Sequence, residues 1–242
     1  MKYIILDAGH NVNTAGKRSP DGSLREYEFN MDVARKTAAL LAEVDGIRAE
    51  VMSSEHASSV SDVNARVALA NREKPDAVVS FHANSAGEKG WYKGADGRSW
   101  NTAEGWEIYC YEPEDRGEGY KLAKAIHDES IPFLELKDRG IKNGAHLALI
   151  RKTTMPVVLI EHAFYTNEAE CALLKTQAFR EKCALAAANG ILAYFGMRKD
   201  TTQPADYYKR VQKRFGFEDK TMTYLNRYQY ADDLLRKLAT AE

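Results

Sequence analysis

Four ionisable residues stand where apolar segments begin or end. His10 follows the apolar run Tyr3–Leu6, His82 follows Ala77–Phe81, Glu161 follows Val157–Ile160, and Glu26 opens a segment with apolar residues at helical spacing. Two imidazoles and one carboxylate are a common ligand set for catalytic zinc, with a fourth position left for water. A further carboxylate that is not a ligand can take a proton from that water and pass it to a leaving amine. One interpretation of these residues is therefore zinc-dependent hydrolysis, with His10, Glu26 and His82 on the metal and Glu161 as the proton shuttle.

Each of these residues also has an ordinary structural interpretation. A histidine at a strand end is commonly polar surface, and a glutamate at a helix start commonly interacts with the helix dipole. Glu161 is harder to explain in this way, because glutamate is rarely buried without a partner. Spacing alone leaves both interpretations open.

Short apolar runs alternate with helical patterns along most of the chain. Strands are expected at 3–6, 49–52, 77–81, 106–111, 147–150 and 157–160, and helices at 26–44, 60–71, 119–130 and 168–195, the last as two helices. This alternation predicts an α/β fold, with an open, mostly parallel or mixed sheet and helices on both faces. Ligands of such sheets collect at the carboxyl ends of the strands, where these polar residues stand.

Composition restricts the class of protein. The formal net charge of -1 gives no general attraction to nucleic acid, and no transmembrane stretch is present. The three cysteines are widely spaced, which favours free thiols over a disulfide framework. No signal peptide is visible after Met1, so the protein is expected to be made in the cytoplasm and to act elsewhere only after release.

Several motifs, in order along the chain, resemble those of the zinc-dependent N-acetylmuramoyl-L-alanine amidases of the amidase-3 type. The resemblance extends from Met1 to about Met197. The matching segments are Ile5–His10, Glu26–Asn30, Ser80–Asn84 and Leu159–Phe164, with Asn167, Arg139-Gly140 and Met155-Pro156 in the corresponding places.

The resemblance implies one Zn²⁺ held by His10, Glu26 and His82, and Glu161 as the catalytic carboxylate. It implies cleavage of the peptidoglycan amide between N-acetylmuramic acid and L-alanine, and we expect a phage or prophage endolysin that lyses bacterial cells. A zinc peptidase with the same metal site, and a wall-binding module with a vestigial site, are the alternatives.

The chain departs from the family in the surroundings of this site. His162 replaces a small or hydroxyl residue after Glu161, and we expect it to point away, because neighbours on a strand face opposite sides. Glu28 is the competing acidic ligand, but it lies on a different side of its helix from Glu26. An aromatic, glycine-rich loop at residues 85–105 either contacts substrate or anchors itself to the domain. The weak substrate-binding candidates are Asn84, Trp91, Trp100 and His146.

The chain is expected to comprise a catalytic domain at residues 1–197, a linker at 198–204 and a small helical region at 205–242. The last region mixes aromatic and basic residues. It is near the lower size limit for independent folding, so docking or self-association is expected.

Overall fold

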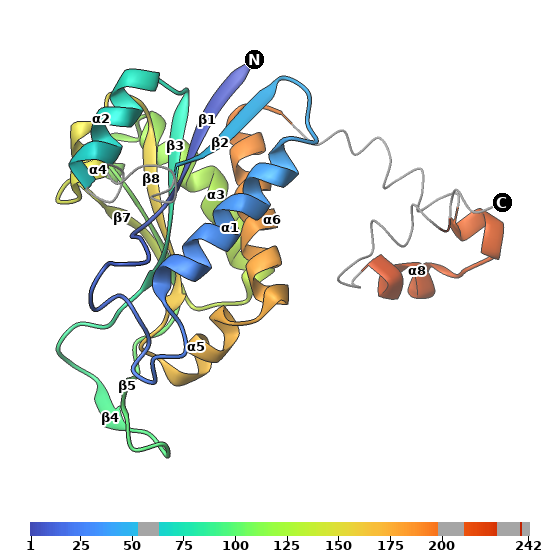
Figure 1. Cartoon of the computed structure of the whole chain (residues 1–242). Coiled ribbons are helices and arrows are strands. Elements are labelled where there is room, and N and C mark those ends of the chain that lie inside the picture. Colours follow the sequence, from blue (N-terminus) through green and yellow to red (C-terminus); the bar gives the residue numbers. More distant parts are fainter. Residues whose placement is uncertain (53–62, 198–210, 227–237, 239–242) are drawn as a thin grey trace. The chain divides into compact units, whose positions relative to one another are not determined.

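A computed structural model describes residues 1–52, 63–197, 211–226 and 238. The chain divides into two units, Met1–Met197 and Arg198–Glu242. The first unit is a three-layer arrangement of a sheet between helices, and the described part of the second unit is helical at 211–215 and in α8 (Figure 1).

The sheet of the first unit has six strands in the order β2-β1-β3-β8-β6-β7. β1, β2, β3 and β8 are parallel, β6 runs antiparallel to β8, and β7 is parallel to β6. This mixed, open sheet confirms the expected fold class. The strands span β1 Lys2–Ala8, β2 Ile47–Met52, β3 Ala77–Asn84, β6 Trp106–Cys110, β7 Asp138–Asn143 and β8 Val157–Phe164.

Helices cover both faces of the sheet (Figure 1). One face carries α1 (Glu26–Leu41), α3 (Glu118–Leu134), α5 (Glu168–Leu174) and α6 (Gln177–Tyr194). The other carries α2 (Val63–Glu73) and the short α4 (Ala148–Lys152), and a 3-10 turn, η2 (Pro113–Asp115), follows β6. Buried apolar residues hold these helices in place: α1 and α3 contact the strands, and α6 packs against α1 and α3.

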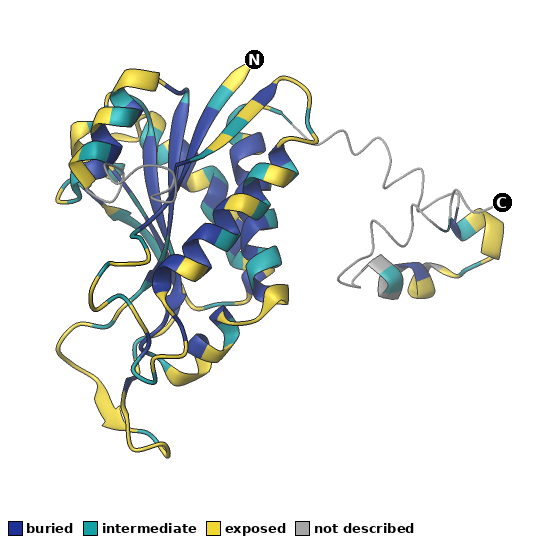
Figure 2. Ribbon diagram, in the orientation of Figure 1, coloured by how far each residue is buried: buried dark blue, intermediate teal, exposed yellow. Residues whose placement is uncertain are grey.

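The central strands are apolar on both sides because both faces are covered. Phe81 and Ile160 belong to the larger core under α1, α3 and α6, whereas Val78 and Leu159 belong to the smaller core under α2 and α4. Figure 2 shows the resulting buried sheet between partly exposed helices.

Two helices of the larger core approach each other closely. Gly190 of α6 lies against α3, where an added Cβ would stand 2.4 Å from the Ile126 Cα. Only a glycine permits this crossing, because real Cβ atoms do not come so near a backbone atom.

Two sequence expectations about this unit were wrong. The apolar run Leu147–Ile150 was expected to be a strand, but it forms α4 after a turn in which the Leu147 amide donates to Gly144. A four-residue apolar run fits a helix or a strand equally, so periodicity could not decide. β7 was not expected at all, because this edge strand carries Ile141 among charged and polar residues.

The segment at residues 85–105 is a hairpin rather than an irregular loop. β4 (Trp91–Lys93) pairs antiparallel with β5 (Ser99–Asn101), and the hairpin projects from one end of the sheet (Figure 1). Trp91 and Tyr92 are exposed, whereas Trp100 is buried in the larger core.

In the second unit, α8 (Asp219–Asn226) places Met222 against Val211. The expected linker at 198–204 and most of the expected tail lie outside the described residues. None of the helices in the described ranges combines the length and apolar character needed to cross a bilayer.

Candidate metal centre

Three predicted metal ligands converge at the carboxyl edge of the sheet. His10 lies in the loop after β1, Glu26 is the first residue of α1, and His82 lies near the end of β3. The Glu26 carboxylate is 3.3 Å from His10 Nε2 and 2.9 Å from His82 Nδ1. One potential ligand atom from each residue lies within 4.8 Å of the other two. The two imidazoles and the carboxylate are therefore close enough to bind one metal ion.

The charge of Glu26 suits a cation. Its side chain is 1% exposed, and its Oε2 atom has no hydrogen-bond partner among the described residues, although Lys17 Nζ is 3.8 Å away. Burial raises the pKa of Glu26, but hydrogen bonds from His10 and His82 outweigh burial and hold that pKa well below its usual range. A buried, ionised carboxylate with an unused oxygen fits a divalent ion. Glu28, the competing residue, is exposed on α1.

A buried arginine holds the backbone of His10. The backbone of His10 has a φ of +62°, a value uncommon outside glycine. Arg66 of α2 donates to the carbonyl oxygens of Ala8 at 2.9 Å and of His10 at 2.8 Å. Arg66 is itself ion-paired with Asp7, which also accepts a 2.6 Å hydrogen bond from Ser80 of β3. These contacts join α2, β1 and β3 around the loop that carries the ligand.

The residue before His10 must be a glycine. A Cβ on Gly9 would stand 2.2 Å from the His82 ring, so the imidazole of His82 packs directly on this backbone. Asn30 of α1 donates to the Gly9 carbonyl at 2.9 Å, and the Gly9 amide donates to Phe81. Asn30 lies one turn after Glu26 on α1, so the same helix supplies a ligand and holds the loop.

Glu161 lies beside the triad on the next strand. It pairs in register with His82 across β3 and β8, so both side chains project from the same face. Its Oε2 atom is buried without a hydrogen-bond partner among the described residues. Burial away from water raises the pKa of Glu161 well above that of an ordinary carboxyl. Such a carboxyl can exchange a proton near neutral pH, as general acid–base catalysis requires.

His162 points to the opposite face of β8, as the alternation of a strand predicts. It is fully buried, with its ring stacked on Phe81 at 6.0 Å and edge-on to Phe29 at 5.4 Å. Both ring nitrogens lack a hydrogen-bond partner among the described residues. Burial, reinforced by His82, lowers the pKa of His162 to about 3. His162 is therefore a neutral core side chain and does not face the metal triad.

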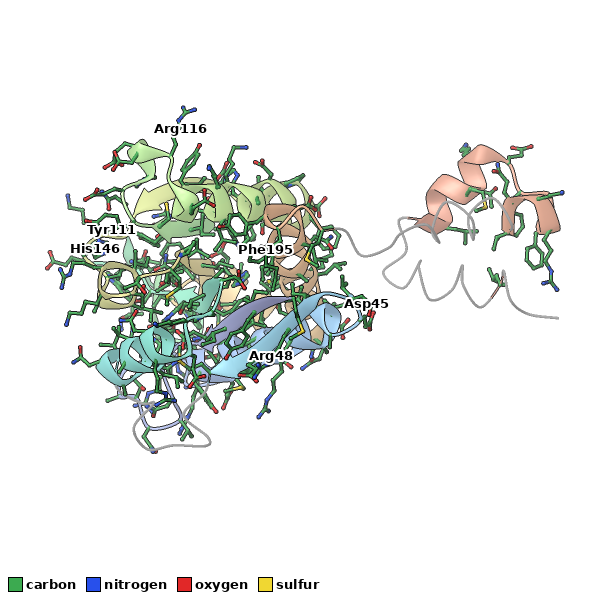
Figure 3. All side chains as sticks on the ribbon, turned by 90° about the horizontal axis from the view of Figure 1, so that it is seen from above. Asp45, Arg48, Tyr111, Arg116, His146 and Phe195 are labelled. Atoms are coloured by element: carbon green, nitrogen blue, oxygen red, sulfur yellow. The ribbon has the colours of Figure 1, made fainter. Side chains whose placement is uncertain are left out.

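The weak substrate candidates fall into different environments. Asn84 donates to the buried Glu107 of β6, and the His146 ring lies edge-on to Tyr109 at 5.9 Å. Figure 3 shows His146 on the side of the domain away from Asp45 and Arg48. Trp91 is exposed on the hairpin, whereas the buried Trp100 fits the anchoring alternative.

Sequence reasoning missed Arg66 and Glu107. A signal existed for both residues. Arg66 shares the apolar side of its helix with Val67 and Ala70, and Glu107 interrupts an apolar strand as Glu161 does. Charged residues at such positions are buried with partners.

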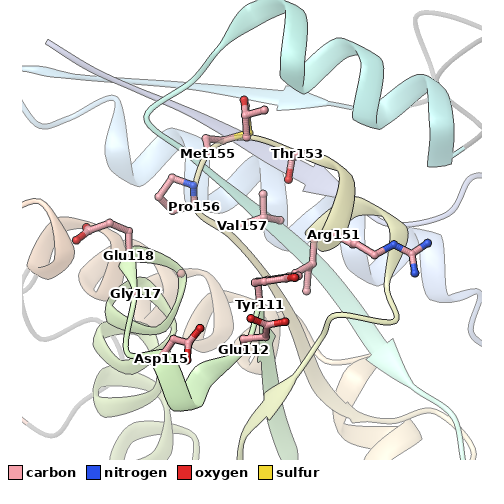
Figure 4. Close-up of a pocket in the computed structure, with 13 residues that line it drawn as sticks. Tyr111, Glu112, Asp115, Gly117, Glu118, Arg151, Thr153, Met155, Pro156 and Val157 are labelled. Atoms are coloured by element: carbon pink, nitrogen blue, oxygen red, sulfur yellow. The ribbon is translucent and has the colours of Figure 1, made fainter.

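A separate hollow lies at the other end of β8, where the strand begins. Figure 4 shows Tyr111, Glu118, Arg151, Met155 and Val157 among its lining residues. Val157 is the first residue of β8, whereas Glu161 is four residues further along the strand. The hollow therefore lies apart from the candidate metal centre.

The fold is a mixed six-stranded sheet between helices, and it carries a candidate metal triad with a buried carboxyl beside it. A family model for N-acetylmuramoyl-L-alanine amidase matches residues 4–193. The sporulation-specific N-acetylmuramoyl-L-alanine amidase of Bacillus subtilis (strain 168) is 27% identical over 210 residues, covering 86% of this chain and 73% of that protein. The endolysin of Bacillus phage SPP1 is 27% identical over 202 residues, covering 82% of this chain and 68% of that protein.

Solved structures give the same result. The catalytic domain of the N-acetylmuramoyl-L-alanine amidase CwlV, from Bacillus (Paenibacillus) polymyxa var. colistinus, matches with a TM-score of 0.70 and 29% identity. The match covers 82% of this chain and all of that domain. The chain belongs to the N-acetylmuramoyl-L-alanine amidase family, which confirms the expected fold and the expected hydrolysis of peptidoglycan.

Proposed function

We propose that this amidase is zinc-dependent, with His10, Glu26 and His82 as the metal ligands and Glu161 as the catalytic carboxyl. One observation carries the proposal: a triad of two imidazoles and a buried carboxylate lies beside a second carboxyl that has an unpaired oxygen. The first unit, Met1–Met197, is proposed to be the catalytic domain. The presence of an endolysin among the relatives agrees with the expected lytic role.

Bound zinc would supply a positive charge that polarises the scissile carbonyl and acidifies water. Side chains of the protein have the other catalytic roles. Glu26 balances the charge of the ion from its buried position, and Arg66 keeps His10 in its uncommon backbone conformation. Glu161 accepts a proton at its carboxylate from the attacking water and donates it to the departing L-alanine amine. The raised pKa makes Glu161 a stronger base than an ordinary carboxylate, and a pKa nearer neutral suits a group that first accepts and then donates a proton.

The substitution Glu161→Gln tests the catalytic role. Glutamine has nearly the same shape but cannot exchange the proton, so kcat is expected to fall roughly 10²- to 10⁴-fold while the bound zinc remains. Glu28→Gln is the matched control, because Glu28 is an exposed glutamate close to the site in sequence. Wall lysis by Glu161→Gln at the full rate would refute the role.

Product analysis tests which bond is cut. An amidase releases new L-alanine amino termini from peptidoglycan and leaves the glycan strands intact. A zinc peptidase would release other amino termini, and a wall-binding module would release none. Zinc dependence is tested on the same reaction, by removing the metal with a chelator and restoring activity with Zn²⁺.

A further inference from the structure

A row of paired residues leads across the sheet from the metal triad to two cations. His82 pairs with Glu161 between β3 and β8, and Glu161 pairs with Glu107 between β8 and β6. Directly paired residues of neighbouring strands project from the same face. On β7, the next strand, Lys142 pairs with Tyr109 and reaches Glu107 on that face.

Glu107 is a buried carboxylate that balances part of the positive charge of Arg139 and Lys142. Its side chain is 3% exposed. Its Oε1 atom accepts hydrogen bonds from Asn84 at 3.0 Å and Tyr109 at 2.7 Å, and its Oε2 atom accepts from Arg139 and Lys142. Burial raises the pKa of Glu107, but these hydrogen bonds, led by the one from Lys142, lower it to about 2. The carboxylate therefore stays ionised and has no oxygen left for another donor.

The two cations exceed the charge that Glu107 neutralises. Arg139 and Lys142 share this one buried carboxylate, which leaves a surplus of one positive charge. Both are about one-third exposed, at 30% and 34%. Arg139 uses Nε for Glu107 and Nη1 for the Glu104 carbonyl at 3.4 Å, and its Nη2 has no hydrogen-bond partner in the described part of the chain. Arg139 and Lys142 therefore carry an excess positive charge, are accessible to solvent and still have N–H groups free to donate to a ligand.

We propose that Arg139 and Lys142 form a binding subsite for a carboxylate on the peptide part of the substrate. This inference rests on the proposed function, because it assumes that the scissile amide lies at Glu161 and the triad. β7 is two strand spacings from β8, or about 10 Å. An extended peptide covers about 3.5 Å per residue, so the carboxylate belongs to one of the first residues after L-alanine. Arginine and lysine bind such a group through charge-assisted hydrogen bonds.

Two synthetic substrates test the subsite. Both are N-acetylmuramoyl-L-alanyl peptides, and they differ only in whether the second residue carries a free carboxylate or the corresponding carboxamide. The wild type is expected to prefer the carboxylate in kcat/KM by roughly ten-fold or more, which is the usual effect of a hydrogen bond to a charged group. The preference is expected in KM, with kcat nearly unchanged, because the subsite lies away from the reacting atoms.

Lys142→Met tests the cation directly, because methionine keeps an apolar side chain of similar length and Arg139 still pairs with Glu107. The carboxylate preference is expected to shrink in this variant and to return in Lys142→Arg. Lys137→Met is the matched control: Lys137 is 62% exposed and pairs with Glu104 outside the row, so the preference is expected to stay.

Two results would overturn the subsite: equal kcat/KM for both substrates in the wild type, or a preference that persists in Lys142→Met. The wild-type comparison needs no variant, so poor folding of Lys142→Met does not prevent a decision. Cleavage of neither substrate by zinc-loaded wild type would overturn the proposed function, and the subsite with it.

Discussion

The buried His162 should make the stability of the first unit depend on pH. Its pKa is lowered from 6.5 to about 3 by burial, so the folded protein keeps the imidazole neutral while the unfolded chain protonates it. The unfolded state therefore binds more protons between these two values, and stability rises with pH across this window. The contribution is complete above pH 6.5 and is lost as the pH falls.

The size of this effect follows from the two pKa values. Each pH unit within the window is worth about 1.4 kcal/mol, so the free energy of unfolding should fall by about 2 kcal/mol from pH 7 to pH 5 through His162 alone. In His162→Met this contribution is absent, and the pH dependence should be flatter by the same amount. At pH 7 the variant should be at least as stable, because it removes two buried nitrogens that have no partner among the described residues.

Urea unfolding followed by tryptophan fluorescence is the suitable assay. Trp91, Trp100 and Trp106 all lie in the first unit, so the signal reports on that unit. A chelator in the buffer removes metal binding as a second source of pH dependence. His146→Gln, at an exposed histidine, is the matched control and should keep the wild-type slope. Identical slopes for wild type and His162→Met would refute the reasoning.

Three further predictions concern the metal centre and the hairpin. Zn²⁺ at about 100 times its Kd should stabilise the protein by about 2.7 kcal/mol, which raises Tm by roughly 5–10 °C. Glu26→Gln should lose this rise in Tm, whereas the control Glu28→Gln should keep it. A rise in Tm that persists in Glu26→Gln would exclude Glu26 as a ligand. Arg66→Lys should weaken zinc binding roughly 10- to 100-fold in a chelator competition. The single ammonium of lysine cannot replace the guanidinium nitrogens that donate to the Ala8 and His10 carbonyls. Unchanged affinity for zinc would contradict this role of Arg66. Trp91→Ala should change the free energy of unfolding by less than about 0.5 kcal/mol and should weaken binding to wall fragments. Trp100→Ala should lower the free energy of unfolding by roughly 3–5 kcal/mol, because Trp100 is buried. Unchanged binding by Trp91→Ala would show that Trp91 makes no substrate contact.

The sequence was most informative where chemistry and strand ends coincide. His10, His82 and Glu161 follow recognisable apolar runs, and the topology of a parallel sheet brings such residues to one edge. Glu26 was preferred over Glu28 from the helix and the motif, and the buried, hydrogen-bonded position of Glu26 agrees with that choice. The orientation of His162 followed from strand alternation alone.

The residues that support the site were harder to predict because their roles depend on tertiary contacts. Arg66 contacts a loop more than fifty residues away in sequence, and no local pattern specifies that partner. β7 has too few apolar residues to be recognised as a strand, so the positions of Arg139 and Lys142 relative to Glu107 could not be anticipated. The strand prediction for Leu147–Ile150 was wrong for a different reason, because four apolar residues are compatible with either a helix or a strand.

The close crossing of α3 and α6 has a consequence for how this enzyme could be altered at a distance. Gly190 lets α3 sit directly against α6, and only residues 135–137 separate the end of α3 from β7. A larger side chain at this crossing must push α3 and α6 apart, and so short a connection would carry any shift of α3 into the strand that bears Arg139 and Lys142. Substrate preference could therefore be changed by evolution or by engineering from within the helical layer, while the triad and Glu161 on the central strands keep their places.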